Sequence, residues 1–141
     1  MRRSPQPKTA ACLSGSRILV VEDDFFIRID LESILRDAGA DIVGPCSGIA
    51  DALAALANGK VTAAILDVRL GCETVAPVAR ELTKKDTPFV FYSGQFDADP
   101  TLAEWPNCRI VAKPALPKTI VAVVADLLER KTQRDVRSPA A

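Results

Sequence analysis

Short apolar runs alternate along the chain with longer segments in which apolar residues recur every third or fourth position. The runs are rich in Val and Ile and lack a regular polar alternation, which is typical of strands buried on both faces of a sheet. The longer segments have the spacing of amphipathic helices. Strands are therefore predicted at residues 17–21, 41–45, 62–68, 88–92 and 108–112.

Capping residues and helix breakers set the expected helix ends. Asp24 stands where it can cap the first helix, and Ser47 can cap the second. Gly and Pro interrupt residues 94–107, so at most a short helix is expected there, at about 100–105. Regular helices are predicted at 24–38, 47–57, 73–84 and from 118 onward.

Strand and helix thus alternate five times, which predicts a doubly wound α/β fold with a five-stranded parallel sheet covered on both faces. The expected strand order is the flavodoxin-like order 2-1-3-4-5, with a fourth helix that is short or irregular. One domain is expected over residues 17–130, between a flexible arm at 1–16 and a flexible tail at 131–141.

Composition and charge narrow the class of protein. Of the 141 residues 48% are hydrophobic, and 18 basic residues balance 18 acidic ones, so net charge gives no argument for binding nucleic acid or a membrane. No apolar run approaches the roughly 18 residues of a membrane span, and the basic N-terminus lacks the apolar region of a secretory signal. Four dispersed cysteines and the lack of histidine argue against a disulfide scaffold, a zinc site or histidine catalysis. A reduced, cytoplasmic chain is expected.

Acidic residues stand where two of the predicted strands end. Glu22 and Asp23 follow the first strand, and Asp67 lies at the end of the third. These strands are neighbours in the expected order, and the carboxyl ends of parallel strands share one edge of the sheet. Converging carboxylates repel one another, and a divalent cation relieves that repulsion. Oxygen ligands without His or clustered Cys favour Mg²⁺, which is the expected cofactor.

The other two strand ends carry groups that can hold a phosphoryl group. Ser93 ends the fourth strand and offers a hydroxyl, and Lys113 ends the fifth and offers a positive charge. An aspartate can accept a phosphoryl group as an acyl phosphate, in a reaction that needs mainly positioning and neutralisation of charge. These residues favour Asp67 as a phosphoryl acceptor.

Over about residues 17–130 the chain resembles the receiver domains of response regulators in two-component and phosphorelay signalling. Each matching segment is weak alone, but four of them in this order, each at a strand end, are specific together. The segments are ILVVEDD (18–24), AAILDVRL (63–70), FVFYSG (89–94) and VAKPA (111–115).

The resemblance implies a metal-assisted acceptor site. Asp67 would be the phosphorylation site, Asp23 a direct metal ligand, and Glu22 a ligand that acts through water. The backbone carbonyl of Arg69 would complete the protein ligands of the ion. Magnesium is the cofactor that the resemblance implies.

The resemblance also implies which residues grip the phosphoryl group and respond to it. Ser93 would be the switch hydroxyl, and Lys113 would contact the phosphate. Receiver domains usually have a cis bond between the lysine and the next proline, so the Lys113–Pro114 bond is expected to be cis.

The chain departs from the common receiver pattern near the predicted switch. Receivers often have an aromatic residue three positions before the lysine, and Ile110 stands there instead. Tyr92 and Phe96 flank the Ser-Gly pair. Together with Ile110, they are candidates for a switch or a partner surface. The stretch PFVFYSGQF (88–96) resembles an atypical subgroup with a PFxFxTGY-like motif.

The expected function is that of a stand-alone response regulator. A sensor histidine kinase or histidine phosphotransfer protein would donate the phosphoryl group, and the chain would be an acceptor rather than an enzyme, with self-catalysed phosphorylation and dephosphorylation. Few residues follow the last predicted helix, so direct DNA binding is not expected. Output would go through contact with a downstream protein, or the domain would act as a relay intermediate or a phosphate sink.

Two other functions stay open at this point. A phosphatase with an aspartyl nucleophile usually has a second acid two residues further on, which the sequence Asp67-Val68-Arg69 lacks. A phosphorylation-independent interaction domain with a receiver-like fold is the other alternative, although the complete set of acidic, hydroxyl and lysine residues argues against it. Each residue also has an ordinary structural interpretation, with Asp67 and Ser93 as turn residues and Lys113 as a surface lysine.

Overall fold

The computed structural model describes residues 12–94 and 99–137. Parallel strands form a central sheet in the order β2-β1-β3-β6-β7, which is the expected order 2-1-3-4-5 of the five sheet strands. The predicted doubly wound fold is therefore confirmed. The strands are β1 (Arg17–Val21), β2 (Asp41–Cys46), β3 (Ala63–Leu66), β6 (Phe89–Ser93) and β7 (Ile110–Ala112).

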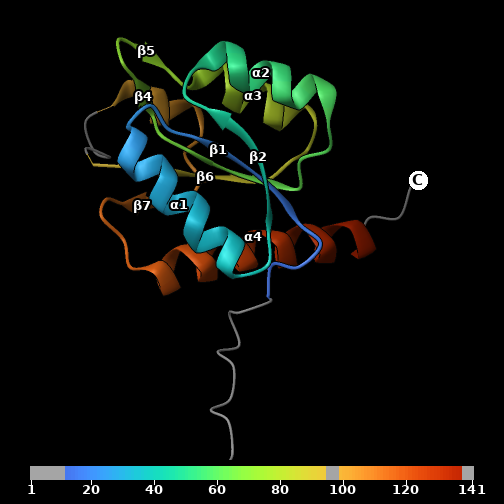
Figure 1. Ribbon diagram of the computed structural model, residues 1–141. Helices are drawn as coiled ribbons and strands as arrows, with labels where there is room; N and C mark the ends of the chain where they lie inside the picture. Colours follow the sequence, from blue (N-terminus) through green and yellow to red (C-terminus); the bar gives the residue numbers. More distant parts are fainter. Residues whose placement is uncertain (1–11, 95–98, 138–141) are drawn as a thin grey trace, which may run out of the picture.

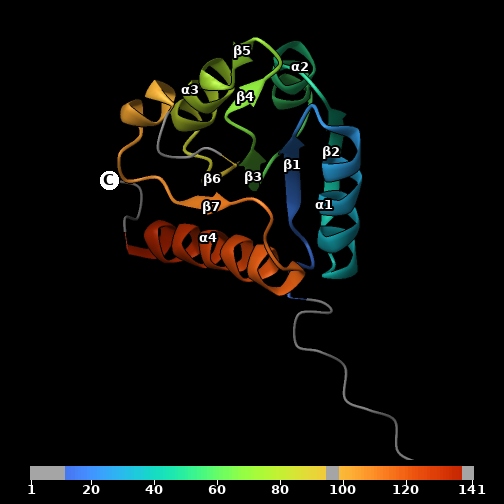
Figure 2. The same ribbon diagram turned by 90° about the vertical axis from the view of Figure 1, so that its left-hand side faces the viewer.

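Helices cover both faces of this sheet. In Figure 1, α1 and α4 lie on one face and α2 and α3 on the other. A short antiparallel hairpin follows β3, and both views place it beside α2 and α3 (Figures 1 and 2). The helices are α1 (Phe25–Asp37), α2 (Ile49–Asn58), α3 (Ala76–Lys84), the 3-10 helix η2 (Pro100–Glu104) and α4 (Pro117–Arg137), and the hairpin is β4 (Arg69–Leu70) with β5 (Glu73–Thr74).

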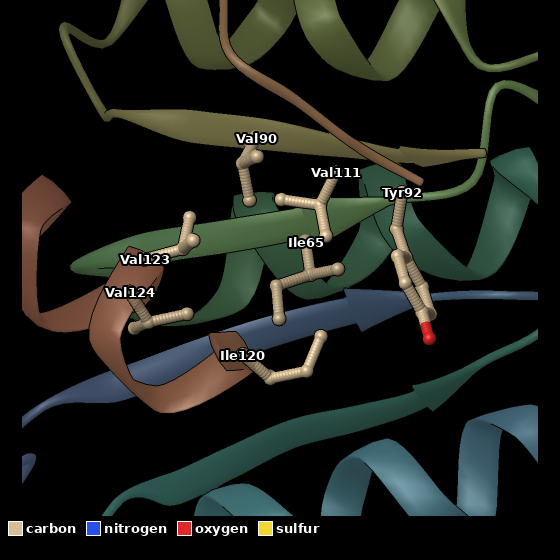
Figure 3. A pocket seen from close by; sticks show the side chains of 7 residues that line it. All are labelled: Ile65, Val90, Tyr92, Val111, Ile120, Val123 and Val124. Carbon is tan, nitrogen blue, oxygen red and sulfur yellow. The ribbon is translucent and has the colours of Figure 1, made fainter. Parts of the chain in front are cut away.

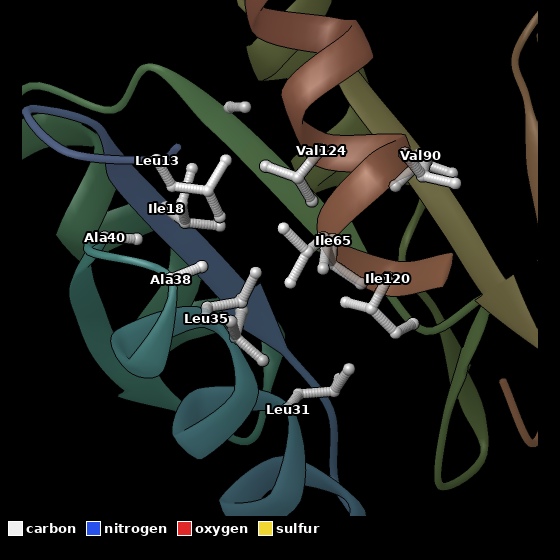
Figure 4. Packing of buried hydrophobic residues seen from close by; sticks show 14 of the residues in the cluster. Leu13, Ile18, Leu31, Leu35, Ala38, Ala40, Ile65, Val90, Ile120 and Val124 are labelled. Atoms are coloured by element: carbon white, nitrogen blue, oxygen red, sulfur yellow. The ribbon is translucent and has the colours of Figure 1, made fainter. Parts of the chain in front are cut away.

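The apolar strands fill two core layers, because successive side chains of a strand point to opposite faces. In β1, Ile18 and Val20 pack with side chains of α1 and α4, whereas Leu19 and Val21 pack with those of α2 and α3. Figure 4 shows the first layer, in which side chains of α1, β1, β3 and α4 interdigitate. Burial on both faces explains why the strand sequences are continuous apolar runs.

One small cavity lies between the sheet and α4 (Figure 3). Its volume is about 10 Å³, and its walls offer a single polar group, the tyrosine hydroxyl at its edge. An ordered water needs two or more polar partners, so this space is a packing gap and not a ligand site. The lining residues are Ile65, Val90, Tyr92, Val111, Ile120, Val123 and Val124.

Helix starts show which capping predictions hold. Asp24 is the N-cap of α1, and its Oδ1 accepts hydrogen bonds from the backbone N–H groups of Phe26 and Ile27 at 3.0 and 3.1 Å. The prediction that Ser47 caps the second helix is wrong, because Gly48 occupies the N-cap position of α2. The third helix begins at Ala76 and not near residue 73, because Glu73–Thr74 pair with β4.

The irregular segment before β7 contains the short helix that the sequence predicts. η2 begins at the cap residue Asp99, whose Oδ1 accepts from the N–H of Thr101 at 2.9 Å. Glu104 at its end forms two hydrogen bonds with Arg80 of α3, at 2.8 and 2.9 Å. These contacts fix η2 on α3.

The packed fold extends beyond the expected limits at residues 17 and 130. Leu13 is fully buried in the layer under α1 and α4, and α4 continues to Arg137. Residues 1–11 of the expected arm and 138–141 of the expected tail lie outside the described residues. Among the described residues, no helix is long and apolar enough to cross a membrane.

Candidate functional site

Backbone pairing brings the predicted site residues to one edge of the sheet. Val21 lies beside Leu66 in the β1–β3 register, and the N–H of Asp67 donates to the carbonyl of Val21 at 2.9 Å. On the next pair of strands, the N–H of Lys113 donates to the carbonyl of Ser93 at 3.0 Å. The residues at the ends of β1, β3, β6 and β7 are therefore held in a fixed relation by the sheet itself.

Three carboxylates meet at this edge, as the sequence predicts. One oxygen from each of Glu22, Asp23 and Asp67 lies within 4.8 Å of the others. Glu22 is 1% exposed and Asp67 9%, whereas Asp23 is exposed. The cluster is thus open to solvent on the Asp23 side and closed beneath Glu22.

Lys113 supplies the positive charge of the cluster. Its Nζ lies 2.8 Å from Oε1 of Glu22 and 3.4 Å from Oδ2 of Asp67. The contact with Glu22 is a short ion pair without the angle of a well-aligned hydrogen bond. One lysine faces three carboxylates, so the cluster retains excess negative charge.

This environment changes the pKa of two groups. Burial, followed by the hydrogen bond and the charge of Glu22, raises the pKa of Asp67 to about 7, and Lys113 opposes that rise. Burial disfavours the charged form of Lys113, but its contacts with Glu22 and Asp67 outweigh this and raise its pKa. The raised pKa of Asp67 reflects its burial beside Glu22, an arrangement that a cation at this site would relieve.

Backbone groups hold the other two carboxylates in place. Oδ2 of Asp23 accepts from the N–H of Gly71 at 2.8 Å, and Oε2 of Glu22 accepts from the N–H of Asp24 at 3.1 Å. Gly71 has a positive φ of 66°, which favours glycine at this turn of the β4–β5 hairpin. Arg28 of α1 donates to the carbonyl of Glu22 at 3.1 Å.

The donor set fits a hard divalent cation. Mg²⁺ prefers carboxylate oxygens and keeps several waters, and a cluster that is open on one side allows both. Oε1 of Glu22 is buried and accepts no well-aligned hydrogen bond from the described residues, so it has a free lone pair for a metal-bound water. The cation would also neutralise the negative charge of the three carboxylates that a single lysine does not neutralise.

The remaining predicted site residues lie in different environments. Ser93 is buried at the end of β6, beside the backbone of Lys113. Ile110 is half-buried and packs in the layer of α2 and α3. Arg69 begins β4, and the position of its carbonyl as a metal ligand stays a prediction. Phe96 lies outside the described residues.

Tyr92 lies in the core and not on a partner surface. It is 6% exposed, lies under α4 among apolar side chains (Figure 3), and its hydroxyl accepts from the N–H of Ala115 at 3.1 Å. Its ring centroid is 5.6 Å from Nζ of Lys113. The peptide bond between Lys113 and Pro114 is cis, as the resemblance implies. Tyr92 therefore helps to fix the loop that carries the lysine, and its role in switching stays a prediction.

Two contributors to the site have no signal in the sequence. The N–H of Gly71 holds Asp23, but a backbone group is invisible in a residue pattern, and the glycine alone indicates only a turn. Asp99 accepts from Nε of Arg69 at 2.6 Å across 30 positions of sequence. Such a long-range pair cannot be read from local spacing.

Comparisons with known proteins identify the fold and the family. The solution structure of SdrG from Sphingomonas melonis is 35% identical, with 84% of this chain and 98% of SdrG covered and a TM-score of 0.71. A response regulator receiver protein from Sinorhizobium medicae is 26% identical over 82% of this chain and 96% of its own, with a TM-score of 0.72. The response regulator PhyR from Brucella abortus has a TM-score of 0.77 at 20% identity, and covers 94% of this chain and 55% of its own.

Sequence comparison agrees over a shorter stretch. A protein-glutamate methylesterase/protein-glutamine glutaminase from Halobacterium salinarum is 36% identical over 90 residues, which is 60% of this chain. The aligned part spans 25% of that enzyme's length. No family model matches the chain. The geometry of the sheet edge and the nearly full-length structural matches lead to one conclusion: the chain belongs to the receiver-domain family of response regulators.

Proposed function

We propose that the chain accepts a phosphoryl group on Asp67 from a phosphohistidine of a partner protein, in a magnesium-dependent reaction. The observation that carries this proposal is the carboxylate of Asp67, which lies 3.4 Å from Nζ of Lys113 and inside a group of three carboxylates within 4.8 Å. An aspartate that only ends a strand does not require a buried acid and a half-buried lysine beside it. An acceptor needs both, one to bind the cation and one to bind the phosphate.

The transfer is a displacement at phosphorus. An oxygen of Asp67 bonds to the phosphorus while the bond from phosphorus to the donor's imidazole nitrogen breaks, and the electron pair of that bond stays on the nitrogen. The imidazole then takes a proton from solvent. The product is an acyl phosphate on Asp67, and no oxidation or reduction takes place.

Each residue of the site has a role in this step. Glu22, Asp23 and Asp67 would hold the magnesium ion, whose chemistry there is to neutralise charge on the phosphoryl oxygens. Lys113 already lies between Glu22 and Asp67 and would contact a phosphoryl oxygen, since its ammonium group can form three hydrogen bonds. Ser93, buried at the end of the neighbouring strand, would add a hydroxyl on the other side.

A protein donor is favoured by an apolar surface next to the acidic cluster. Phe25, Phe26 and Ile29 on the first turns of α1 are 57%, 80% and 46% exposed, and Leu116 before α4 is 62% exposed. Phe25 follows the acidic pair by two positions and Leu116 follows Lys113 by three. Exposed apolar side chains of this size mark interaction surfaces. Docking of the donor here would bring its phosphohistidine to Asp67.

Signalling by the phosphorylated chain is part of the same proposal. The phosphoryl group shifts an equilibrium between two conformations, and a downstream protein binds the phosphorylated form, or the group passes onward in a relay. In this role the chain is a phosphoprotein of the cytoplasm and not an enzyme that turns over a substrate.

The test is labelling by a small phosphodonor. The purified chain is incubated with acetyl phosphate and MgCl₂, and its intact mass is followed over time. One phosphoryl group per chain is expected, with no label in EDTA and none in an Asp67→Asn variant. An Asp37→Asn variant, which removes an exposed carboxylate at the far end of α1, is the matched control and should label like the parent. Equal labelling of the Asp67→Asn variant would refute the proposal, and no labelling of any variant would favour a phosphorylation-independent interaction domain.

A further inference from the structure

A short ion pair joins the first residue of β4 to the N-cap residue of η2. Nε of Arg69 lies 2.6 Å from Oδ2 of Asp99. The side chain of Arg69 is 52% exposed, whereas that of Asp99 is 8% exposed. Within the described part of the chain, this guanidinium makes one hydrogen bond.

Asp99 has a second contact that ties it to η2. Its other oxygen, Oδ1, accepts from the N–H of Thr101 and caps the first turn of η2 at 2.9 Å. Burial favours the neutral form of Asp99, but the hydrogen bonds from Thr101 and Arg69 outweigh burial and lower its pKa. One carboxylate therefore connects the residue two positions after Asp67 to the start of η2.

The far end of η2 is fixed independently of the site. Glu104 pairs with Arg80 of α3, and the indole N–H of Trp105 donates to Oγ1 of Thr83 at 3.1 Å. The ring of Trp105 packs edge-on against Phe89 and Phe91 of β6, with centroids 6.2 and 6.0 Å apart. Among the contacts of the described residues, the link between Arg69 and Asp99 joins the start of η2 to the segment that follows Asp67.

Arg69 can reach a phosphoryl group on Asp67. Two residues of extended chain separate Cα atoms by at most about 7 Å, and an arginine side chain is about as long. A phosphoryl group carries a charge of about −1.5 to −2 with three acceptor oxygens, which the guanidinium fork can grip with two parallel hydrogen bonds. Asp99 offers a single charge and, in this structure, one hydrogen bond to Arg69.

We propose that phosphorylation of Asp67 draws the guanidinium of Arg69 from Asp99 to the phosphoryl oxygens, and so loosens the first turn of η2. This inference rests on the proposed function, since it needs a phosphoryl group on Asp67. It gives the chain a route from the site to η2 that does not use an aromatic residue at position 110, where Ile110 packs in the core layer of α2 and α3. The bistable element is the Arg69 side chain, which has two anions within reach and one positive charge to share.

Trp105 is the single tryptophan of the chain and lies at the end of η2 that is held on α3, so its fluorescence is a control that is expected to stay unchanged. Amide hydrogen exchange of peptides that cover residues 99–105 and the fluorescence of Trp105 are measured before and after treatment with acetyl phosphate and MgCl₂. Phosphorylation is expected to speed exchange at 99–102 about two- to fivefold, the size of effect that loss of a partly exposed ion pair produces. Intact mass, recorded on the same samples, reports whether the phosphoryl group is present.

Variants separate this inference from general loosening of the fold. Asp99→Asn and Arg69→Gln should each show fast exchange at 99–102 without the phosphodonor, and phosphorylation of Asp99→Asn should add no further increase. Arg36→Gln, which removes an exposed arginine that pairs on the far side of the molecule with Glu32, should behave as the parent does. Absence of any mass increase would overturn the proposed function. A normal mass increase with unchanged exchange at 99–102, or a further increase in phosphorylated Asp99→Asn, would overturn the role of Arg69 and leave the acceptor function intact.

Discussion

Replacing the acceptor aspartate by asparagine is expected to stabilise the metal-free protein. Asp67 shares its site with Glu22 and Asp23, and burial and the charge of Glu22 raise its pKa from 3.8 to about 7. At about 1.4 kcal/mol for each pH unit, the ionised form costs the folded state at most about 4 kcal/mol above pH 8. That cost already includes the attraction to Lys113, and the buried amide keeps part of the cost of desolvation, so we expect a net gain of about 2 kcal/mol.

The pH dependence gives this prediction its sign. A carboxyl group whose pKa is raised on folding stabilises the folded state below its unfolded pKa, and the effect is lost as pH rises through its folded pKa. We therefore compare the free energies of unfolding of the parent chain and of Asp67→Asn. The two should be similar near pH 4, and that of the parent should fall progressively below that of the variant up to about pH 8. Taking the difference between the two proteins cancels the titration of groups that do not interact with Asp67.

Urea unfolding at a series of pH values, in EDTA, measures the effect. The variant should have a higher midpoint at pH 8 with an unchanged slope against urea, and an Asp30→Asn change at an exposed site of α1 should have little effect. Added MgCl₂ should stabilise the parent and reduce the difference in urea midpoint between the parent and Asp67→Asn. An Asp67→Asn protein that is equally or less stable at pH 8 would refute the assignment of mutual repulsion to this cluster.

Other changes test single contacts of the site and core. Lys113→Ala should destabilise the protein by about 2–3 kcal/mol at pH 7 and slow labelling strongly, because it leaves Glu22 buried without its 2.8 Å ion pair; unchanged labelling would contradict the role of the lysine. Asp24→Ala should cost about 1 kcal/mol, measured by urea unfolding, because it removes the cap of α1. Ile65→Ala, in a side chain that is 2% exposed, should cost about 3 kcal/mol and leave labelling at 15 °C intact, since the site lies beyond the end of β3. Phe26→Ser should slow transfer from a phosphorylated partner protein without changing labelling by acetyl phosphate, and equal slowing in both assays would contradict docking at α1.

The parts of the fold that follow from local pattern could be predicted from the sequence. The runs at Ile18–Val21 and Ala63–Leu66 are buried on both faces, so they are apolar throughout and their ends are marked by the first charged residue. Because parallel strands share one edge, the residues just past those ends, Glu22 and Asp67, had to be neighbours once the strand order was assumed. Fold and acidic cluster therefore had signals in the sequence.

Features that depend on long-range or backbone contacts could not be predicted. The hairpin of β4 and β5 is too short to show an alternation, and it displaced the expected start of the third helix to Ala76. Gly48 stands at the N-cap position of α2 in place of Ser47, and it makes no side-chain hydrogen bond that a residue pattern could indicate. Arg69 and Asp99 form an ion pair although they are 30 positions apart, and no local pattern in the sequence indicates that their segments are close in the folded chain.

Mapping of the phosphorylated residue tests the central claim most directly. The chain is labelled with acetyl phosphate and MgCl₂, treated with borohydride, which reduces an aspartyl phosphate to homoserine, and digested for mass spectrometry of its peptides. We predict homoserine at position 67 and unmodified carboxylates at Glu22 and Asp23. Reduction at another acidic residue, with Asp67 unmodified, would contradict the account.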